Sequence, residues 1–104
     1  MRMPSSAFPS FGASPSEARL VHRLVRQAAK PAGFETFEIE FGEDSTGDPA
    51  VWIWFTISEN FPTSKQGIGR LGELARAVKQ KILASRINRL AYVRFRSESG
   101  LKRA

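Results

Sequence analysis

The sequence predicts an α+β fold with element order α-β-β-α-β, a two-layer sandwich in which a three-stranded mixed sheet carries both helices on one face. Three observations support this prediction. Apolar residues recur every three or four positions in residues 15–30 and 64–86, which indicates two amphipathic helices. Apolar and polar residues alternate in residues 34–41 and 90–97, which indicates half-buried strands. Residues 50–57 are apolar on both sides, as expected of a central strand.

The first predicted helix begins with residues that can satisfy its free amide groups. Ser14 can cap the helix, Pro15 suits the first helical position, and Glu17 completes a capping box while favouring the positive end of the helix dipole. The sequence KPAG predicts that this helix stops near Lys30. The apolar stripe of the helix comprises Leu20, Val21, Leu24, Val25 and Ala28.

Strand alternation assigns the side chains of the three predicted strands to two faces of the sheet. The residues expected to face inward are Phe37, Ile39, Phe41, Val51, Ile53, Phe55, Ala91, Val93 and Phe95. The residues expected on the opposite face are Glu38, Glu40, Trp52, Trp54, Tyr92, Arg94 and Arg96.

The second predicted helix follows the loop ENFPTSKQ, in which Thr63 and Gln66 have the spacing of a capping box. The early part of this helix contains Gly67, Gly69 and Gly72. Each glycine costs up to about 1 kcal/mol in a helix interior, so they indicate a loop, a kink or a close approach of another backbone. The apolar stripe comprises Ile68, Leu71, Ala75, Val78 and Ile82.

Chain connections predict the arrangement of the strands. The first two strands form an antiparallel hairpin, and a right-handed crossover through the second helix makes the second and third strands parallel. Because residues 50–57 are apolar on both sides, the strand order is 1-2-3. The predicted core comprises Leu24, Phe37, Val51, Ile53, Phe55, Leu71, Val78, Ile82 and Val93.

Length and composition predict one domain, residues 14–97, between a flexible arm (1–13) and a flexible tail (98–104). The 104 residues contain no apolar run long enough for a membrane span, and the N-terminus has no continuous apolar stretch typical of a signal peptide. With no cysteine, disulfides and cysteine-based metal sites are excluded. We therefore expect a cytoplasmic protein that does not contact membranes.

The net charge of +6 is distributed unevenly along the chain. Residues 1–33 carry +4, residues 34–64 carry −7, and residues 65–104 carry +9. A uniformly basic nucleic-acid-binding protein would not show this pattern, and part of the basic charge can be neutralised within the fold.

The acidic segment GEDSTGDP, residues 42–49, has the composition of a turn. Gly42 and Gly47 tolerate positive φ, and Asp44, Ser45 and Asp48 can bond to amides of the loop. The segment lacks the spacing of an EF-hand and the GK[ST] sequence of a phosphate-binding loop. Glu43, Asp44 and Asp48 could provide oxygens for Mg²⁺, but acidic loops are usually solvated, so we expect a turn and no metal.

Few residues in the sequence suggest catalysis. The only histidine, His22, lies beside the apolar stripe of the first helix, and no Ser–His–Asp or paired-metal pattern is present. We expect a non-catalytic protein without a cofactor.

Two binding hypotheses follow from the aromatic side of the sheet. In the first, Trp52, Trp54, Tyr92, Arg94 and Arg96 form an interface for a second copy or a cognate protein, because such residues dominate binding energy at interfaces. In the second, the tryptophans stack on bases while basic residues hold phosphates. These basic residues are Arg70, Arg76, Lys79, Lys81 and Arg86, together with the two strand arginines. A third reading has the N-terminal arm cover the tryptophans through Phe8 and Phe11.

Two segments resemble known families. The motif IGRLGELA, residues 68–75, with Gly69, Arg70 and Gly72, resembles the GxxG loop of type II KH domains, which implies a grip on a nucleic-acid backbone; the sequence leaves no room for the helix that precedes this loop in that family. GEDSTGDPAVWIW and YVRFR, within residues 34–96, are similar to small uncharacterised bacterial αββαβ proteins found beside HEPN-type partners. That resemblance implies a non-catalytic, antitoxin-like partner protein.

Overall fold

A computed structural model describes residues 13–34, 36–62 and 64–98 of the chain. The element order is α-β-β-α-β, as predicted. The elements are α1 (Pro15–Ala32), β2 (Phe37–Glu43), β3 (Pro49–Ile57), α2 (Lys65–Leu83) and β4 (Leu90–Ser97). The predicted flexible arm lies outside the described residues except for Ala13, and so does the predicted tail except for Glu98.

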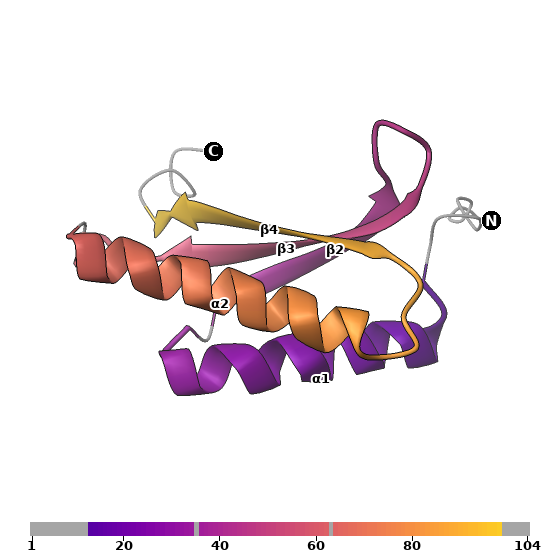
Figure 1. Ribbon diagram of the computed structural model, residues 1–104, viewed down its shortest axis with the longest axis horizontal. Coiled ribbons are helices and arrows are strands. Elements are labelled where there is room, and N and C mark those ends of the chain that lie inside the picture. The colour runs from indigo at the N-terminus through magenta and orange to yellow at the C-terminus, as the bar shows by residue number, and fades with distance from the viewer. Residues whose placement is uncertain (1–12, 35, 63, 99–104) are drawn as a thin grey trace.

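The strands form one mixed sheet with β3 in the centre. β2 pairs antiparallel with β3, and β3 pairs parallel with β4, which gives the order β2-β3-β4. Both helices lie against one face of this sheet, side by side (Figure 1). The predicted two-layer fold and strand order are therefore confirmed.

Helix α1 begins with the predicted Ser14 cap and ends slightly later than predicted, but the Glu17 carboxylate binds Arg89 instead of completing a capping box. The Ser14 side chain accepts a hydrogen bond of 3.1 Å from the Glu17 amide, with Pro15 at the first helical position. The helix continues through Pro31 to Ala32, beyond the expected end near Lys30. Gly33 ends it in the left-handed conformation, with φ 85°, and its amide bonds back to the last turn.

Helix α2 differs from the prediction at both ends. Its N-cap is Ser64, whose side chain accepts from the Gly67 amide, rather than Thr63 in a capping box with Gln66. Thr63 itself lies outside the described residues. The helix ends at Leu83, three residues before Arg86. Beyond this end, the Ser85 hydroxyl donates to the Ile82 carbonyl at 2.6 Å.

The three glycines of α2 lie in the helix itself, and they have different surroundings. A Cβ at Gly67 would lie 2.0 Å from the Pro62 carbonyl oxygen, so the preceding loop excludes any larger residue there. Gly69 and Gly72 have no atom within 4 Å of such a Cβ. Of the expected causes, close backbone packing therefore applies to Gly67 alone, and residues 67–72 do not form a loop.

We expect opposite effects from alanine at two of these glycines. Gly72→Ala should raise the free energy of unfolding by up to about 1 kcal/mol, because alanine favours the helix and meets no neighbour. Gly67→Ala should lower it by about 1–3 kcal/mol, because the Pro62 carbonyl must move. Urea denaturation of both variants measures this difference. Equal effects in the same direction would contradict the packing described here.

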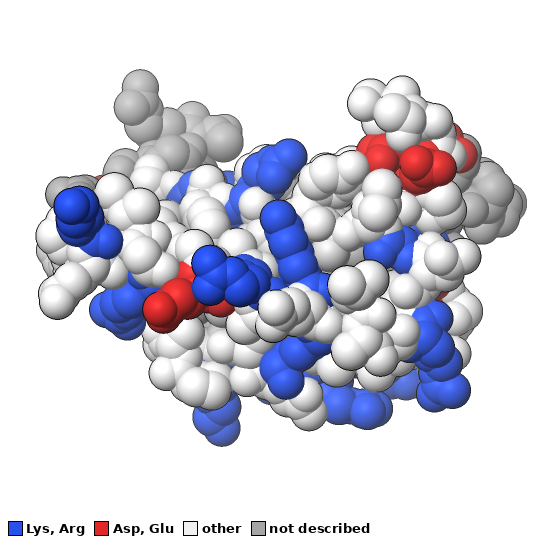
Figure 2. Space-filling model, viewed as in Figure 1, with Lys and Arg blue, Asp and Glu red and all other residues white. Residues whose placement is uncertain are grey.

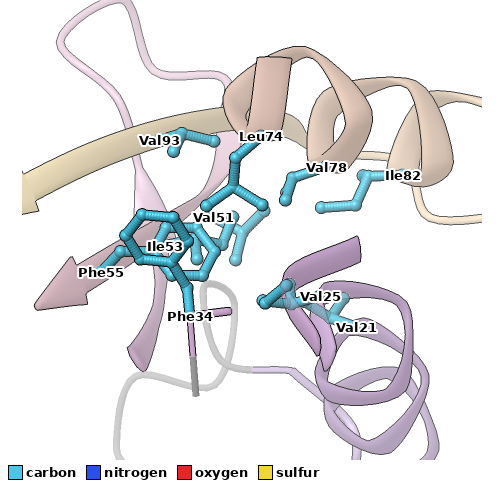
Figure 3. Packing of buried hydrophobic residues seen from close by; sticks show 11 residues of the cluster. Val21, Val25, Phe34, Val51, Ile53, Phe55, Leu74, Val78, Ile82 and Val93 are labelled. Atoms are coloured by element: carbon cyan, nitrogen blue, oxygen red, sulfur yellow. The ribbon is translucent and has the colours of Figure 1, made fainter. Parts of the chain in front are cut away.

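The core fills the space between the sheet and the helices. Val51, Ile53 and Phe55 of β3 are fully buried and point toward the apolar faces of α1 and α2 (Figure 3). The buried cluster comprises Val21, Val25, Ala29, Phe34, Val51, Ile53, Phe55, Leu74, Val78, Ile82 and Val93. Leu24, Phe37 and Leu71, which the sequence placed in the core, are partly buried and pack against it.

The prediction that Ile68 belongs to the buried apolar stripe of α2 is wrong. Ile68 is 61% exposed, whereas Leu74, absent from that stripe, is buried. Gly67 rests on the preceding loop and is buried, so the inward face of the helix continues through residues 71, 74, 78 and 82. Successive residues of an α-helix differ by roughly 100° around its axis, so Ile68, which follows the inward-facing Gly67, points outward.

Neither helix that the structure describes has an apolar stretch long enough to cross a bilayer.

Candidate functional site

The sheet face opposite the helices carries the aromatic and charged residues predicted to share one side. We call this surface the open face; it comprises Glu38, Glu40, Trp52, Trp54, Tyr92, Arg94 and Arg96. None of the described helices or strands covers it (Figure 1). The register aligns Glu38, Trp54 and Arg94 in one row across the sheet, and Glu40, Trp52 and Tyr92 in the next. Acidic residues therefore lie along β2, tryptophans along β3, and arginines along β4.

Trp54 is partly covered by an ion pair of its own chain. The Arg96 guanidinium lies over the Trp54 ring, 5.2 Å from its centroid, and its Nη2 donates to Glu38 Oε1. The cation–π contact joins β4 to β3, and the Arg96–Glu38 ion pair bridges the two edge strands across β3. Beside it, a depression of ≈ 480 Å³ is lined by Glu38, Ile39, Glu40, Trp54 and Arg96.

Trp52 has different neighbours. Its ring stacks on Tyr92 with centroids 5.7 Å apart, and the Arg94 guanidinium lies 5.5 Å from the Tyr92 centroid. A Cβ at Gly42 would lie 3.3 Å from the Trp52 ring. Gly42 lies in β2 and is not among the described glycines with positive φ, so its predicted role in the turn is wrong: its small size makes room for the indole.

Both tryptophans are consequently half-buried through contacts within the domain. Phe8 and Phe11, which the sequence suggested as a cover, lie outside the described residues.

The loop between β2 and β3 is organised by the Asp44 carboxylate. Its Oδ1 accepts from the Thr46 amide, the Thr46 hydroxyl and the Asp48 amide at 2.9, 2.7 and 3.0 Å. Its Oδ2 accepts from the Tyr92 hydroxyl at 2.9 Å, which ties the loop to β4. Gly47 has φ 87°, as its place in the turn requires. The prediction of turn chemistry is confirmed for Asp44 and Gly47.

These bonds change the acidity of both partners. The hydrogen bond from the Thr46 side chain, with those from Asp48, Tyr92 and the Thr46 amide, lowers the Asp44 pKa from 3.8 to about 2, against the opposing effect of partial burial. The hydrogen bond to Asp44, together with desolvation, raises the pKa of Tyr92 above 10.0. Because the folded pKa of Asp44 is the lower one, its stabilisation is present above about pH 4 and is lost as the pH falls toward 2.

We expect Asp44→Ala to shift the titration of Tyr92 to lower pH, because the neutral phenol then loses its acceptor and the nearby negative charge. Tyr92 is the only tyrosine, so ultraviolet absorption follows it directly. Glu43→Gln, at an adjacent residue without a bond to Tyr92, serves as the control. An unchanged Tyr92 titration in Asp44→Ala would contradict this account.

The three acids considered for Mg²⁺, Glu43, Asp44 and Asp48, do not form a cluster in the structure. Among residues 13–98, apart from positions 35 and 63, no group of three or more His, Asp or Glu side chains is close enough to hold an ion. Asp44, one of the three acids considered for Mg²⁺, is engaged by the loop and Tyr92. His22 is an exposed residue of α1 that packs on Phe37, with ring centroids 5.2 Å apart.

The helical basic residues predicted to hold phosphates lie on the layer opposite the open face, whereas Arg94 and Arg96, predicted to act with them, lie on the open face itself. Lys and Arg are spread over the helices, and acidic residues form one patch at the loop between β2 and β3 and a second, smaller one among the helical basic residues (Figure 2). Arg76, Lys79 and Arg86 are exposed, Lys81 is half-buried, and Arg70 donates to Ala32 O at 3.3 Å. The helical cations and the tryptophans therefore do not form one continuous site.

Sequence reasoning missed Arg89, whose side chain is only 7% exposed. Its Nε donates to Glu17 Oε2 at 2.7 Å, its Nη1 reaches the carbonyls of Gly42 and Ala50, and its guanidinium lies 5.1 Å from the Phe41 centroid. Two signals were available: Arg89 has the inward parity of β4, and Glu17 is the only acid among residues 1–33. Arg89 joins α1 to the sheet and faces away from the open face.

Comparison with known protein families, with curated proteins and with solved structures finds no match for this chain.

Proposed function

We propose that the protein is a non-catalytic binding module that associates with another protein through the open face. The observation that carries this proposal is a strip of three aromatic side chains, Trp52, Trp54 and Tyr92, on a sheet face that no described element covers. Tryptophan, tyrosine and arginine provide most of the binding energy at protein interfaces.

The charges of the open face support a protein rather than a polyanion. Glu38 and Glu40 balance Arg94 and Arg96 on this surface, and the acidic loop lies at one end of it. Nucleic acid would be repelled by the β2 side, whereas a protein surface can provide charges of both signs. Side chains on regular strands are also held in place before binding, which lowers the entropy cost of association.

Site-specific photocrosslinking in cells tests this proposal. A photoreactive residue at Glu38, which is 71% exposed, should form an adduct with one identified protein. The same residue at Arg76, on the exposed side of α2, serves as the control and should not form that adduct. Trp52→Ala with Trp54→Ala, and separately the surface change Arg94→Ala, should both abolish it.

Each possible adduct has a defined meaning. An adduct of twice the chain mass identifies a second copy, and a heterologous protein identifies a cognate partner, of which an antitoxin-like pairing is one form. Adducts with RNA, with residues 1–13 of the same chain, or only at Arg76 would overturn the proposal.

A second candidate function is binding of a nucleic-acid backbone. It is favoured by the basic residues that line two depressions on the layer formed by α1 and α2, which we call the helical layer. Arg19, Arg23 and Arg86 line a depression of ≈ 500 Å³ between α1 and the end of α2. Arg76 and Lys79 line another, of ≈ 350 Å³, on the outer side of α2. This candidate requires no base stacking on the tryptophans.

Salt dependence tests the second candidate. If the layer makes six phosphate contacts, the log–log slope of affinity against salt should be roughly −5 for duplex DNA and nearer −4 for a single strand. Arg76→Gln with Lys79→Gln should reduce the magnitude of the slope, while Arg94→Gln on the open face should not. Absence of binding at low salt, or a slope near zero, would exclude it.

A further inference from the structure

From the charge pattern of the open face, we infer that its partner is a second copy of this chain, in a two-fold dimer whose axis runs parallel to β3. This inference rests on the proposed function and makes it more specific. The pattern is acidic on β2, aromatic on β3 and basic on β4, in rows fixed by the strand register. Such a surface can be complementary to itself.

Symmetry decides which strands would face each other. A two-fold axis parallel to β3 places β2 of one copy over β4 of the other and keeps each row at its own height, so acidic residues face basic ones and tryptophans face tryptophans. An axis perpendicular to the strands would instead place β2 over β2 and β4 over β4, with like charges in contact. Sheets that pack face to face keep their strands within about 30° of each other, which the first arrangement allows.

Two charges of the open face form no ion pair with a described residue. Glu38 is already paired with Arg96, whereas Glu40 and Arg94 are exposed, and neither has such a partner. The Arg94 guanidinium leans over the Tyr92 ring, and Tyr92 shares its row with Glu40. In the dimer, Arg94 of one copy therefore reaches Glu40 of the other, and the reciprocal pair forms by symmetry.

The face is small, because it is only three strands wide with neighbouring strands about 4.8 Å apart. Its area falls toward the lower end of specific interfaces, so we expect a dimer in exchange with monomer at micromolar concentrations. Sedimentation equilibrium of the full chain over roughly 5–500 µM covers the range in which such an interface dissociates.

Charge reversal gives a sharp test of this arrangement. Glu40→Arg makes the exposed pair entirely basic, and Arg94→Glu makes it entirely acidic, so each variant alone should dimerise about tenfold or more weakly than the wild type. Mixed in equal amounts, the two variants should form a heterodimer, because each Arg then faces a Glu. A chain with both changes should regain the wild-type affinity. Arg76→Glu, on the helical layer, should have no effect.

The outcomes separate this inference from the proposed function. A wild-type chain that stays monomeric to 500 µM, or reversed variants that do not recombine, would overturn the two-fold dimer. If the crosslink at Glu38 then identifies a different protein, the open face remains the interface and only the partner changes. If the chain dimerises but only Arg76→Glu disrupts it, both the dimer through the open face and the assignment of that face are wrong.

Discussion

Ile53→Ala should lower the free energy of unfolding by about 2–5 kcal/mol, the range for removing most of a buried aliphatic side chain. Ile53 is fully buried at the centre of β3, with Ile39 and Val93 as its register neighbours. The side chain lies between the sheet and both helices, where surrounding residues cannot close the space without moving a whole element (Figure 3). Guanidinium denaturation followed by circular dichroism measures the loss.

Ile68→Ala provides a control with the same chemical change. Ile68 is 61% exposed on α2, so its truncation should change stability by no more than about 0.5 kcal/mol. A loss below 1 kcal/mol for Ile53→Ala, or similar losses for both variants, would mean that the two faces of the sheet are reversed.

Arg89→Ala should be comparably damaging, although Arg89 is a charged residue. Removing one partner of a buried ion pair costs about 3–5 kcal/mol, and we expect the lower end because Glu17 is 23% exposed and can regain water. The change also leaves the carbonyls of Gly42 and Ala50 without this donor and removes the contact with Phe41. Thermal unfolding and urea denaturation, compared at one pH, report the effect.

Two further variants identify the source of that loss. Arg86→Ala removes an exposed arginine from the same connection and should be nearly neutral. Arg89→Lys keeps the charge but replaces the forked guanidinium with a single ammonium group, which cannot reach Glu17 and both carbonyls at once. It should therefore recover only part of the stability. Full recovery by lysine would show that charge alone is needed, contrary to the geometry.

The fold was predictable because its signals are local and agree with one another. Strand alternation fixes which side of β3 carries Ile53 and which carries the tryptophans, and the doubly apolar composition of β3 places it in the centre. Helix periodicity is less decisive. Both Ile68 and Leu74 fit a spacing of three or four. The rotation of α2 depends on tertiary packing, with Gly67 against the Pro62 carbonyl and Leu74 in the core.

The residues of the open face were predictable, but their contacts were not. Alternation places Trp52 and Arg96 on one side of the sheet. It does not predict that the Arg96 guanidinium lies over the Trp54 ring, because that contact depends on the side-chain conformations across β3. Gly42 shows the same limit: its sequence context indicates a turn, and only the fold brings an indole against it. Strand parity turns Arg89 inward, but its partner Glu17 is 72 positions away in the sequence, and no local pattern specifies that pairing.

The parallel pairing of β3 with β4 has consequences for the order of folding. The β2–β3 hairpin closes through a short loop, whereas β4 can pair only after α2 has bridged from one end of the sheet to the other, with a larger loss of chain entropy. We therefore expect the contacts of β4 to form late, so that weakening them accelerates unfolding more than it slows refolding. Because β4 supplies Tyr92, Arg94 and Arg96, the open face is complete only in the fully folded chain. A partner that requires this surface would then distinguish native molecules from folding intermediates that have only the hairpin and its tryptophans.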